Sequence, residues 1–279
     1  MNLIDFYIGD VHGRSDLLAK LLTFLQRHAR MRDAQPRYTF LGDLIDRGPD
    51  PVNCMEMAIS VTNHYPGSAI LLGNHEQMML DAIKTRGKSE MAGNWALNGG
   101  LKTVEAYSGK FDIEGFLRLM AVEYRHHFNM IDAAPLFVQR QGLVAAHAGV
   151  DRTSALETQG AKTLCWIREP FLDHVDAEVL PVIHGHSIVG PRPVVTENRI
   201  SLDTGAYKSE RLSACIVDHG AWDISFAQAT PKDARYIEAV RLDRGHGTVL
   251  DNPERLFKAP APSQEPAAYT DTRPCSIRR

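Results

Sequence analysis

The first 85 residues repeat one pattern three times: an apolar run, a glycine, and then apolar residues at helical spacing. The apolar runs cover residues 3–8, 37–41 and 68–72. The glycines that close them are 33 and 31 residues apart: Gly9, Gly42 and Gly73. Strands that alternate with helices at this period are typical of right-handed βαβ crossovers. The sequence therefore predicts an α/β protein with a parallel sheet at its centre.

Three helices are expected after these strands. The first has Ser15 as its N-cap and runs for about 15 residues, because leucines recur at helical spacing. Pro51 suits the first position of the second helix, and the third covers residues 76–83. Residues 86–108 are rich in Gly, Asn and Lys, which predicts an irregular surface segment, and helical spacing returns at 111–124.

The second half of the chain changes to short β-like runs. They lie at residues 128–131, 136–140, 143–146, 179–183, 194–202, 212–217 and 224–227. These runs predict a mixed sheet, or two packed sheets, with helices outside. We expect one domain over residues 1–258 and a disordered, proline-rich tail at 259–279.

Composition excludes several classes of function. The 31 Lys and Arg against 34 Asp and Glu give a net charge of −3, which does not fit binding to nucleic acid or an anionic membrane surface. The four cysteines are scattered, which disfavours a zinc finger or a disulfide framework. No signal-peptide pattern or long apolar run is present, so we expect a soluble, cytoplasmic protein.

Polar residues collect where strands are expected to end, which is where α/β proteins place functional groups. Six of them are typical metal ligands: Asp10, His12, Asp43, Asn74, His147 and His186. Asp10, His12 and Asp43 can hold one divalent ion, and Asp43 can bridge to a second ion held by Asn74 and the two later histidines. Turn formation, helix capping or core packing is the alternative role for these residues, but it does not explain why His12 and His75 lie beside them.

A two-metal site of this kind suits a phosphate ester. Two ions can share a hydroxide and hold an oxygen-rich anion for in-line displacement, and only two carboxylates oppose their charge. Arg47 can bind phosphate oxygens through its guanidinium. His75 can act as general acid toward the leaving oxygen, and Asp46 can orient it.

The remaining histidines are expected to have ordinary roles. His184, two residues before His186, is expected to face elsewhere and to be structural. The others are interpreted as surface or packing residues: His28, His64, His126, His127, His174, His219 and His246.

The motifs GDVHG, GDLIDRG, GNHE, HAG and GHS occur in this order. Together they resemble the PPP family of binuclear metallophosphatases, in its bacterial phosphoprotein phosphatase branch, over residues 10–218. The resemblance implies a metallophosphatase α/β sandwich of mixed sheets flanked by helices, and two divalent ions, with manganese expected and iron or zinc as alternatives. It also implies that Arg168 is a second phosphate-binding arginine.

The sequence departs from this pattern in two places. Relatives often have a glycine before the Leu-Thr run where this chain has Tyr207-Lys208-Ser209-Glu210, so the shape of that loop is not predicted by the resemblance. Ser187 replaces the commoner threonine, which is a small change.

Three functions remain open. The first is hydrolysis of phosphoserine or phosphothreonine, and of phosphotyrosine as an extension, in a phosphorylated protein or peptide. The second is hydrolysis of dinucleoside polyphosphates such as diadenosine tetraphosphate, but Asp46 and Glu76 fit the first reaction better. The third is a catalytically silent binding module, which should lack a ligand or His75, and none is missing. The sequence makes no prediction of oligomeric state.

Overall fold

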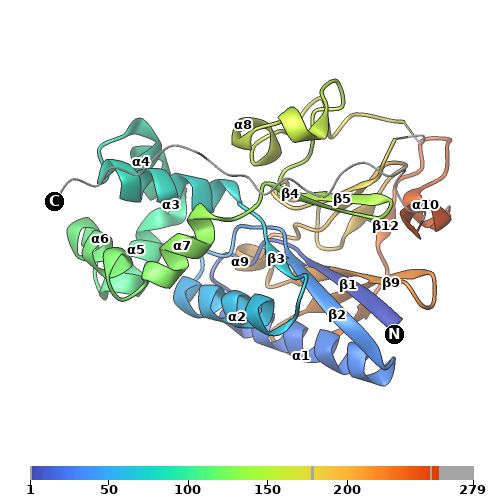
Figure 1. Cartoon of the computed structure of the whole chain (residues 1–279), viewed down its shortest axis with the longest axis horizontal. Helices are drawn as coiled ribbons and strands as arrows, with labels where there is room; N and C mark the ends of the chain where they lie inside the picture. The colour runs from blue at the N-terminus through green and yellow to red at the C-terminus, as the bar shows by residue number, and fades with distance from the viewer. Residues whose placement is uncertain (1, 177–178, 252, 258–279) are drawn as a thin grey trace.

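A computed structural model describes residues 2–176, 179–251 and 253–257, so the predicted tail at 259–279 lies outside the described residues. Within this part of the chain, twelve strands form two six-stranded sheets. The strand orders are β11-β10-β9-β1-β2-β3 and β12-β7-β8-β6-β5-β4. Helices flank both sheets (Figure 1), which confirms the predicted α/β sandwich.

The first sheet contains the repeated βα units. Its parallel strands are β1 (Asn2–Ile8), β2 (Ala34–Phe40) and β3 (Ala69–Ile70), and its antiparallel strands are β9 (Leu212–Asp218), β10 (Asp223–Ala229) and β11 (Ala234–Ile237). Helices α1 (Ser15–Met31) and α2 (Pro51–His64) make the two crossovers, and α3 (Asn74–Thr85) follows β3. The predicted parallel sheet is therefore confirmed, although β3 is shorter than expected.

The second sheet is assembled from the later short runs. Its strands are β4 (Phe137–Arg140), β5 (Leu143–Ala146), β6 (Val182–His184), β7 (Val194–Val195), β8 (Arg199–Ser201) and β12 (Val240–Arg241). Strands β5, β6 and β8 are parallel, whereas β4 and β7 pair with them in the antiparallel sense. The run at 194–202, expected as one segment, forms two strands joined by a turn.

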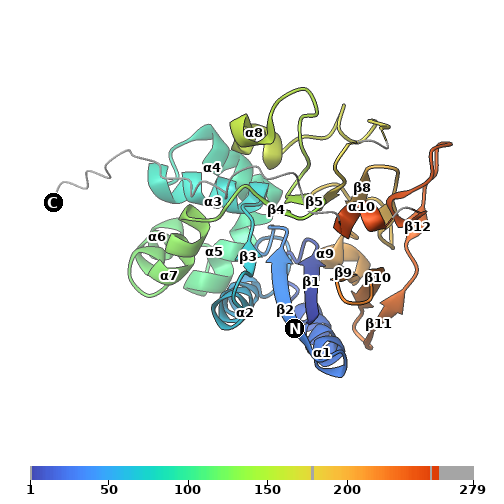
Figure 2. The same cartoon turned by 45° about the vertical axis from the view of Figure 1, so that its right-hand side comes forward.

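Alternation along β1 divides its side chains between two cores. Ile4, Phe6 and Ile8 pack with the buried leucines of α1, whereas Tyr7 packs in the core between the sheets, with Ile183 of β6. Successive side chains of a strand point to opposite faces, so one strand can serve both layers. Figure 2 shows α1 and α2 on the outer side of β1 and β2, away from the second sheet.

The segment at 86–108, predicted to be irregular, is helical, and that prediction was wrong. Helix α4 (Glu90–Trp95) continues through a kinked turn at Ala96–Gly100 into α5 (Leu101–Ser108). Ser89 caps α4 by accepting a hydrogen bond from the backbone N–H of Ala92 at 3.0 Å. Burial of Trp95 and Tyr107 among the helices outweighs the low helix propensity of Gly and Asn here.

Two further predictions were also wrong. Residues 128–131 are part of a helix, α7 (Arg125–Asp132), which follows α6 (Ile113–Ala121); Ile131 is buried on its inner face. A short apolar run alone does not distinguish a strand from a buried helical turn. Ser15 does not cap α1 but is its first residue, and its hydroxyl donates to Asp50 at 2.5 Å.

The remaining helices are short. They are α8 (Ala161–Leu164), α9 (Ala206–Ser209), α10 (Glu254–Phe257) and the 3-10 turns Leu156–Thr158 and Val249–Asp251. Among the helices described, none is long and apolar enough to cross a membrane.

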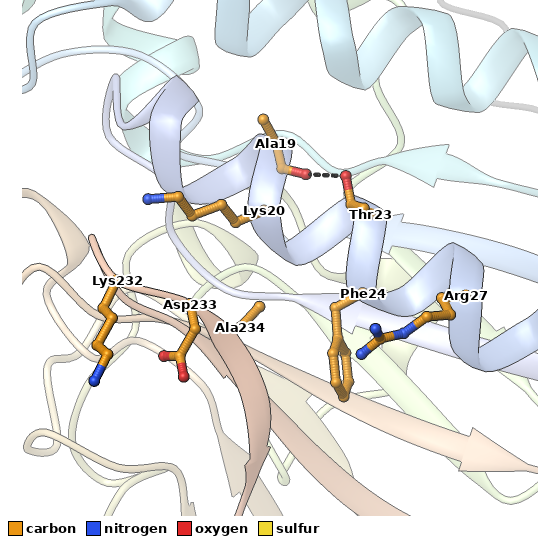
Figure 3. A pocket seen from close by; sticks show the side chains of 8 residues that line it. All are labelled: Ala19, Lys20, Thr23, Phe24, Arg27, Lys232, Asp233 and Ala234. Atoms are coloured by element: carbon orange, nitrogen blue, oxygen red, sulfur yellow. Dashed lines mark hydrogen bonds between the residues drawn. The ribbon is translucent and has the colours of Figure 1, made fainter.

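An open groove of about 360 Å³ lies between α1 and the start of β11 (Figure 3). It is lined by Ala19, Lys20, Thr23, Phe24, Arg27, Lys232, Asp233 and Ala234. None of these residues belongs to the strand-end motifs, so the chemistry predicted from the sequence lies elsewhere.

Candidate functional site

The strand-end motifs of both sheets meet at one place. Segments after β1, β2 and β3 supply residues from the first sheet, and segments after β5 and β6 supply residues from the second. Seven of the predicted site residues are buried here: Asp10, His12, Asp43, Asp46, Asn74, His75 and His147. His186 and Arg47 are half-buried and Arg168 is exposed, so the site opens to solvent on their side.

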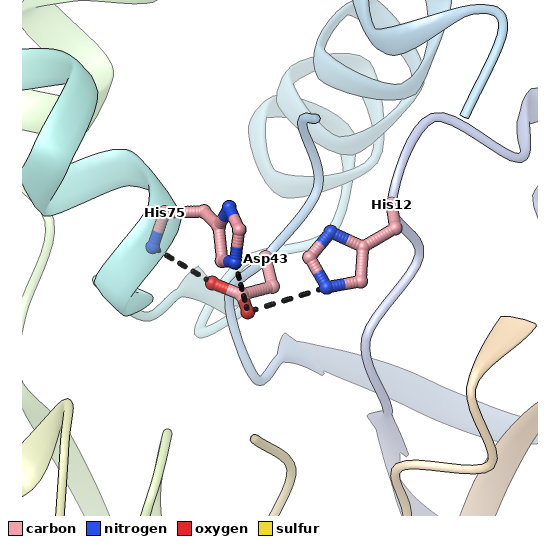
Figure 4. A group of neighbouring side chains, drawn as sticks. All are labelled: His12, Asp43 and His75. Carbon is pink, nitrogen blue, oxygen red and sulfur yellow. Dashed lines mark hydrogen bonds and ion pairs between the residues drawn. The ribbon is translucent and has the colours of Figure 1, made fainter. Parts of the chain in front are cut away.

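The carboxylate of Asp43 lies at the centre of the site. Its Oδ2 is 3.5 Å from Nε2 of His12 and 4.0 Å from Nε2 of His75 (Figure 4). Its Oδ1 is 3.5 Å from Nε2 of His147. Burial raises the pKa of Asp43, but the surrounding imidazoles outweigh burial and hold the pKa below its usual value. Oδ2 of Asp43 therefore faces His12 and His75, and Oδ1 faces His147. A carboxylate that bridges two metal ions is expected to have different ligands on its two oxygens in this way.

The rings of His12 and His147 are held in the same way. Nδ1 of His12 is 2.8 Å from the carbonyl oxygen of Ile45, and Nδ1 of His147 is 2.7 Å from that of Leu41. A carbonyl only accepts, so each Nδ1 carries the proton and each Nε2 is an unprotonated acceptor; that of His12 faces Nη1 of Arg47 at 2.7 Å. Burial lowers the pKa of His12 to about 3, so the ring is neutral. Neutral imidazoles held by a backbone carbonyl are oriented as metal ligands usually are.

A second group forms around the amide of Asn74. Its Oδ1 is 2.9 Å from Nε2 of His147 and 3.0 Å from Nδ1 of His186. Because Nε2 of His147 has no proton in the tautomer set by Leu41, it and the amide oxygen are two acceptors facing each other. Two acceptors at this distance repel each other unless a cation lies with them, so this group suits a metal ion.

Asp10 reaches the site beside the segment Gly185–His186. Its Oδ2 accepts a hydrogen bond from the backbone N–H of His186 at 2.9 Å. Its Oδ1 is buried and has no hydrogen-bond partner among the described residues. A Cβ at Gly185 would lie 1.9 Å from Oδ1, so only glycine allows this close approach. The unpaired oxygen is the kind of buried acceptor that a cation satisfies.

Like charges accumulate in the site. Burial, Asp203 and Asp43 raise the pKa of Asp10 well above its usual value, and burial and Asp43 raise that of Asp203 to about 6. Charge repulsion between these carboxylates would be relieved by divalent cations. Together with the paired acceptors and the unpaired oxygen of Asp10, this shows that the residues present fit a divalent metal centre.

His75 is held beside this centre by Asp46. Nδ1 of His75 is 2.6 Å from Oδ2 of Asp46. Burial lowers the pKa of His75, but Asp43 and Asp46 outweigh burial and raise it. Asp46 also accepts hydrogen bonds from the indole N–H of Trp95 at 2.8 Å and from the hydroxyl of Thr103 at 2.6 Å. Trp95 and Thr103 have no role that the sequence predicts, because both lie on helices in the segment expected to be irregular.

Glu76 holds the loop that carries Asp43. Its two carboxylate oxygens accept hydrogen bonds from the backbone N–H groups of Asp43 and Leu44, both at 2.8 Å. Burial and Asp43 raise the pKa of Glu76 to about 7. In the sequence, only the position of Glu76 directly after His75 indicated that it could hold the Asp43 loop.

Arg47 enters the site from the same loop. Its Nη1 is 2.7 Å from Nε2 of His12 and its Nη2 is 2.9 Å from Nε2 of His75. The guanidinium lies 4.8 Å from the ring centre of Tyr207, in the loop where the sequence departs from its relatives. The backbone N–H of Arg47 donates to the carbonyl of Gly99 at 3.3 Å, and a Cβ at Gly99 would lie 2.8 Å from Cγ of Arg47.

Arg168 and His184 have different surroundings near His186. Nη1 of Arg168 donates to the hydroxyl of Ser187 at 3.2 Å, which places the guanidinium near His186 at the exposed side of the site. His184 is buried, and its Nε2 lies 2.7 Å from the hydroxyl of Ser201. This contact accounts for His184 as a packing residue, as the sequence analysis expected.

The chain is similar to proteins of one known family. Residues 6–190 match a family model described as calcineurin-like phosphoesterase. Over 93 residues, 33% of this chain, the sequence is 37% identical to serine/threonine-protein phosphatase 1 of Salmonella typhimurium and covers 37% of that protein. Over 217 residues it is 27% identical to serine/threonine-protein phosphatase 2 of the same organism, with 74% of this chain and 89% of the relative covered.

The fold is also that of solved structures. A crystal structure provisionally described as a diadenosine tetraphosphatase superposes with a TM-score of 0.52 at 17% identity, covering 82% of this chain and 98% of the other. The two Salmonella relatives support the resemblance to the bacterial phosphoprotein phosphatase branch. The family match spans more than half of the 279 residues. The chain therefore belongs to the calcineurin-like phosphoesterase family.

Proposed function

We propose that this protein is a metal-dependent phosphatase that hydrolyses phosphoserine and phosphothreonine monoesters in proteins or peptides. The proposal extends to phosphotyrosine monoesters as further substrates. The observation that carries the proposal is the buried His75–Asp46 pair, at 2.6 Å, placed next to the ligand groups around Asp43 and to the guanidinium of Arg47. Membership of a phosphoesterase family and the phosphatase names of two relatives support hydrolysis of a phosphate ester.

The metal ligands that we propose form two groups that share Asp43. Asp10 and His12 would hold one divalent ion with Asp43, and Asn74, His147 and His186 would hold the second with it. Manganese is the metal that we propose for both positions, with iron or zinc as alternatives. When bound, such ions supply Lewis acidity toward phosphate oxygens and a lowered pKa for bound water.

Arg47 and Arg168 are the residues that we propose to bind the phosphate. Each guanidinium can donate two parallel hydrogen bonds to a phosphate, which a lysine cannot do. Arg47 already reaches two imidazoles within the site, so it needs only to exchange these partners for phosphate oxygens. Arg168 lies on the exposed side, where a peptide chain has room to extend.

His75 is the general acid in this proposal. Its Nδ1 proton is held by Asp46, so Nε2 is the nitrogen that faces the site and can protonate the leaving oxygen. Its raised pKa increases the fraction of rings that carry the second proton near neutral pH. Asp46 stabilises the charged ring and fixes its orientation.

Hydrolysis of dinucleoside polyphosphates is the second candidate, because one solved structure with this fold is provisionally described as a diadenosine tetraphosphatase. The test is a comparison of kcat/KM, with manganese present, on a phosphoserine peptide, a phosphotyrosine peptide and diadenosine tetraphosphate. We expect the phosphoserine peptide to be hydrolysed with the highest kcat/KM. A clear preference for diadenosine tetraphosphate would overturn the phosphoprotein assignment.

The third possibility is a catalytically silent binding module, and an assay of phosphate hydrolysis by the same protein tests it. We expect it to hydrolyse an aryl phosphate monoester, to lose this activity in a chelator and to regain it best with manganese. Absence of turnover with manganese, iron and zinc alike would favour a binding module, and full activity after complete metal removal would exclude the two-metal mechanism.

A further inference from the structure

Three side chains of ligand type meet outside the strand-end site, between α2 and α7. Oε1 of Glu56 is 3.0 Å from Nε2 of His126 and 3.0 Å from Nε2 of His127. One ligand atom from each residue lies within 4.8 Å of the other two. We propose that Glu56, His126 and His127 form a separate binding site for a divalent transition ion, with zinc as the ion that suits it best.

The distances fit such an ion. In a tetrahedral zinc site the metal lies about 2.0–2.1 Å from each ligand, which places the ligand atoms about 3.4 Å apart. Both distances from Oε1 are 3.0 Å, so the carboxylate and the two rings need to separate by only a few tenths of an ångström. Two imidazoles and one carboxylate are a common zinc ligand set, and water can fill the fourth position.

The three side chains of this site differ in their exposure to solvent. The side chain of His127 is fully buried, whereas those of Glu56 and His126 are 46% and 49% exposed. An ion can therefore enter from solvent and bind against a fixed histidine. The site would join α2 to α7, which are far apart in the sequence.

His127 is further supported by a third helix. The hydroxyl of Tyr107, in α5, lies 2.7 Å from Nδ1 of His127. Histidines that bind metals usually have their other ring nitrogen held by such a partner. Burial, with His126 beside it, lowers the pKa of His127 to about 4, so the ring is neutral at pH 7 and has a lone pair for a metal.

A hydrogen-bonded cluster without metal is the alternative, and it requires the opposite tautomer. If Nε2 of His127 donates to Glu56, then Nδ1 must accept from the hydroxyl of Tyr107. If Nε2 binds a metal, Nδ1 carries the proton and donates to the oxygen of Tyr107. The tyrosine hydroxyl can take either role, so metal binding would reverse the hydrogen bond between Tyr107 and His127.

The experiment uses the full chain loaded with manganese in excess. Zinc is then added in equilibrium dialysis, and zinc bound per chain is measured for wild type, His126→Ala and Glu56→Gln. We expect wild type to bind one zinc ion more than either variant. His64→Ala is the matched control, because His64 is an exposed histidine of α2 outside the cluster, and it should keep the wild-type value.

A second variant distinguishes a specific effect on zinc binding from a general loss of stability. Tyr107→Phe keeps the aromatic ring and removes the hydroxyl, so it should weaken the extra zinc site about tenfold while the ion count at saturation is unchanged. Equal zinc content in wild type and in folded His126→Ala would overturn the proposal. Because zinc content is measured rather than phosphatase activity, the result does not depend on the function proposed above.

Discussion

Nδ1 of His75 lies 2.6 Å from Oδ2 of Asp46, and both side chains are buried. Asp46 is itself held on both oxygens, by Trp95 and by Thr103. The carboxylate cannot turn without losing one of these bonds, so the imidazole keeps one orientation. His75 thereby presents Nε2 toward Asp43 and Arg47.

His75→Asn tests the role of this ring. We expect kcat on an aryl phosphate to fall by roughly 10²–10⁴, because the leaving oxygen loses its proton donor. Metal content, measured by elemental analysis after dialysis, should stay that of wild type. Loss of metal together with activity would show instead that His75, whose Nε2 lies 4.0 Å from Oδ2 of Asp43, is a ligand.

Trp95→Phe tests the support behind Asp46. The indole N–H donates to Asp46 at 2.8 Å, and phenylalanine keeps the apolar ring but removes this donor. We expect kcat to fall about tenfold, which corresponds to about 1.4 kcal/mol for one lost hydrogen bond. Trp222→Phe is the control, since Trp222 is 59% exposed and outside the site. If both variants turn over at the same rate and have the same Tm, the contact has no catalytic role.

Asp43→Asn tests whether one carboxylate serves both ligand groups. Asp43 faces His12 on one oxygen and His147 on the other, both at 3.5 Å. An amide has no negative charge to share, so we expect the affinity for both ions to fall together. The measurement is manganese bound per chain as free manganese is raised. Loss of a single ion, with the other at wild-type affinity, would argue against bridging.

Asp5→Asn tests a buried ion cluster far from these ligands. Asp5 accepts two hydrogen bonds of 2.7 Å from Arg37, and it is also bound by Arg140 at 3.1 Å and His219 at 2.8 Å. Removal of its charge leaves cations with no counter-charge, so the free energy of unfolding should fall by about 3 kcal/mol in a urea titration. Asp16→Asn is the control: its side chain is 48% exposed, and it should change stability by less than 1 kcal/mol.

The same aspartate predicts how stability depends on pH. Burial raises the pKa of Asp5, but hydrogen bonds from His219 and Arg37 outweigh burial and lower the pKa from 3.8 to about 2. Because the folded pKa lies below the unfolded one, this stabilisation is present above pH 3.8 and is lost as the pH falls through about 2. We expect wild type to lose about 2 kcal/mol more than Asp5→Asn between pH 5 and pH 2. Parallel curves for the two proteins would contradict this assignment.

The sequence by itself determined the elements that depend on local pattern. Apolar runs closed by glycine predicted β1, β2 and β3, and leucine spacing predicted α1, because side-chain periodicity is a property of neighbouring residues. The polar residues that follow those glycines, such as Asp10 and Asp43, could be selected as ligands because strand ends in α/β folds meet at one edge.

Other features were decided only by the tertiary structure. Trp95 and Thr103 contact Asp46 across 49 and 57 residues of sequence, and no local signal marks either of them as its partner. The helices around Trp95 form in a segment rich in Gly and Asn, because burial of aromatic side chains compensates for poor helix propensity. In the same way, His126 and His127 meet Glu56 only because α7 packs against α2. Contacts of this kind depend on how the elements pack, and packing is a property of the whole chain rather than of any one segment of it.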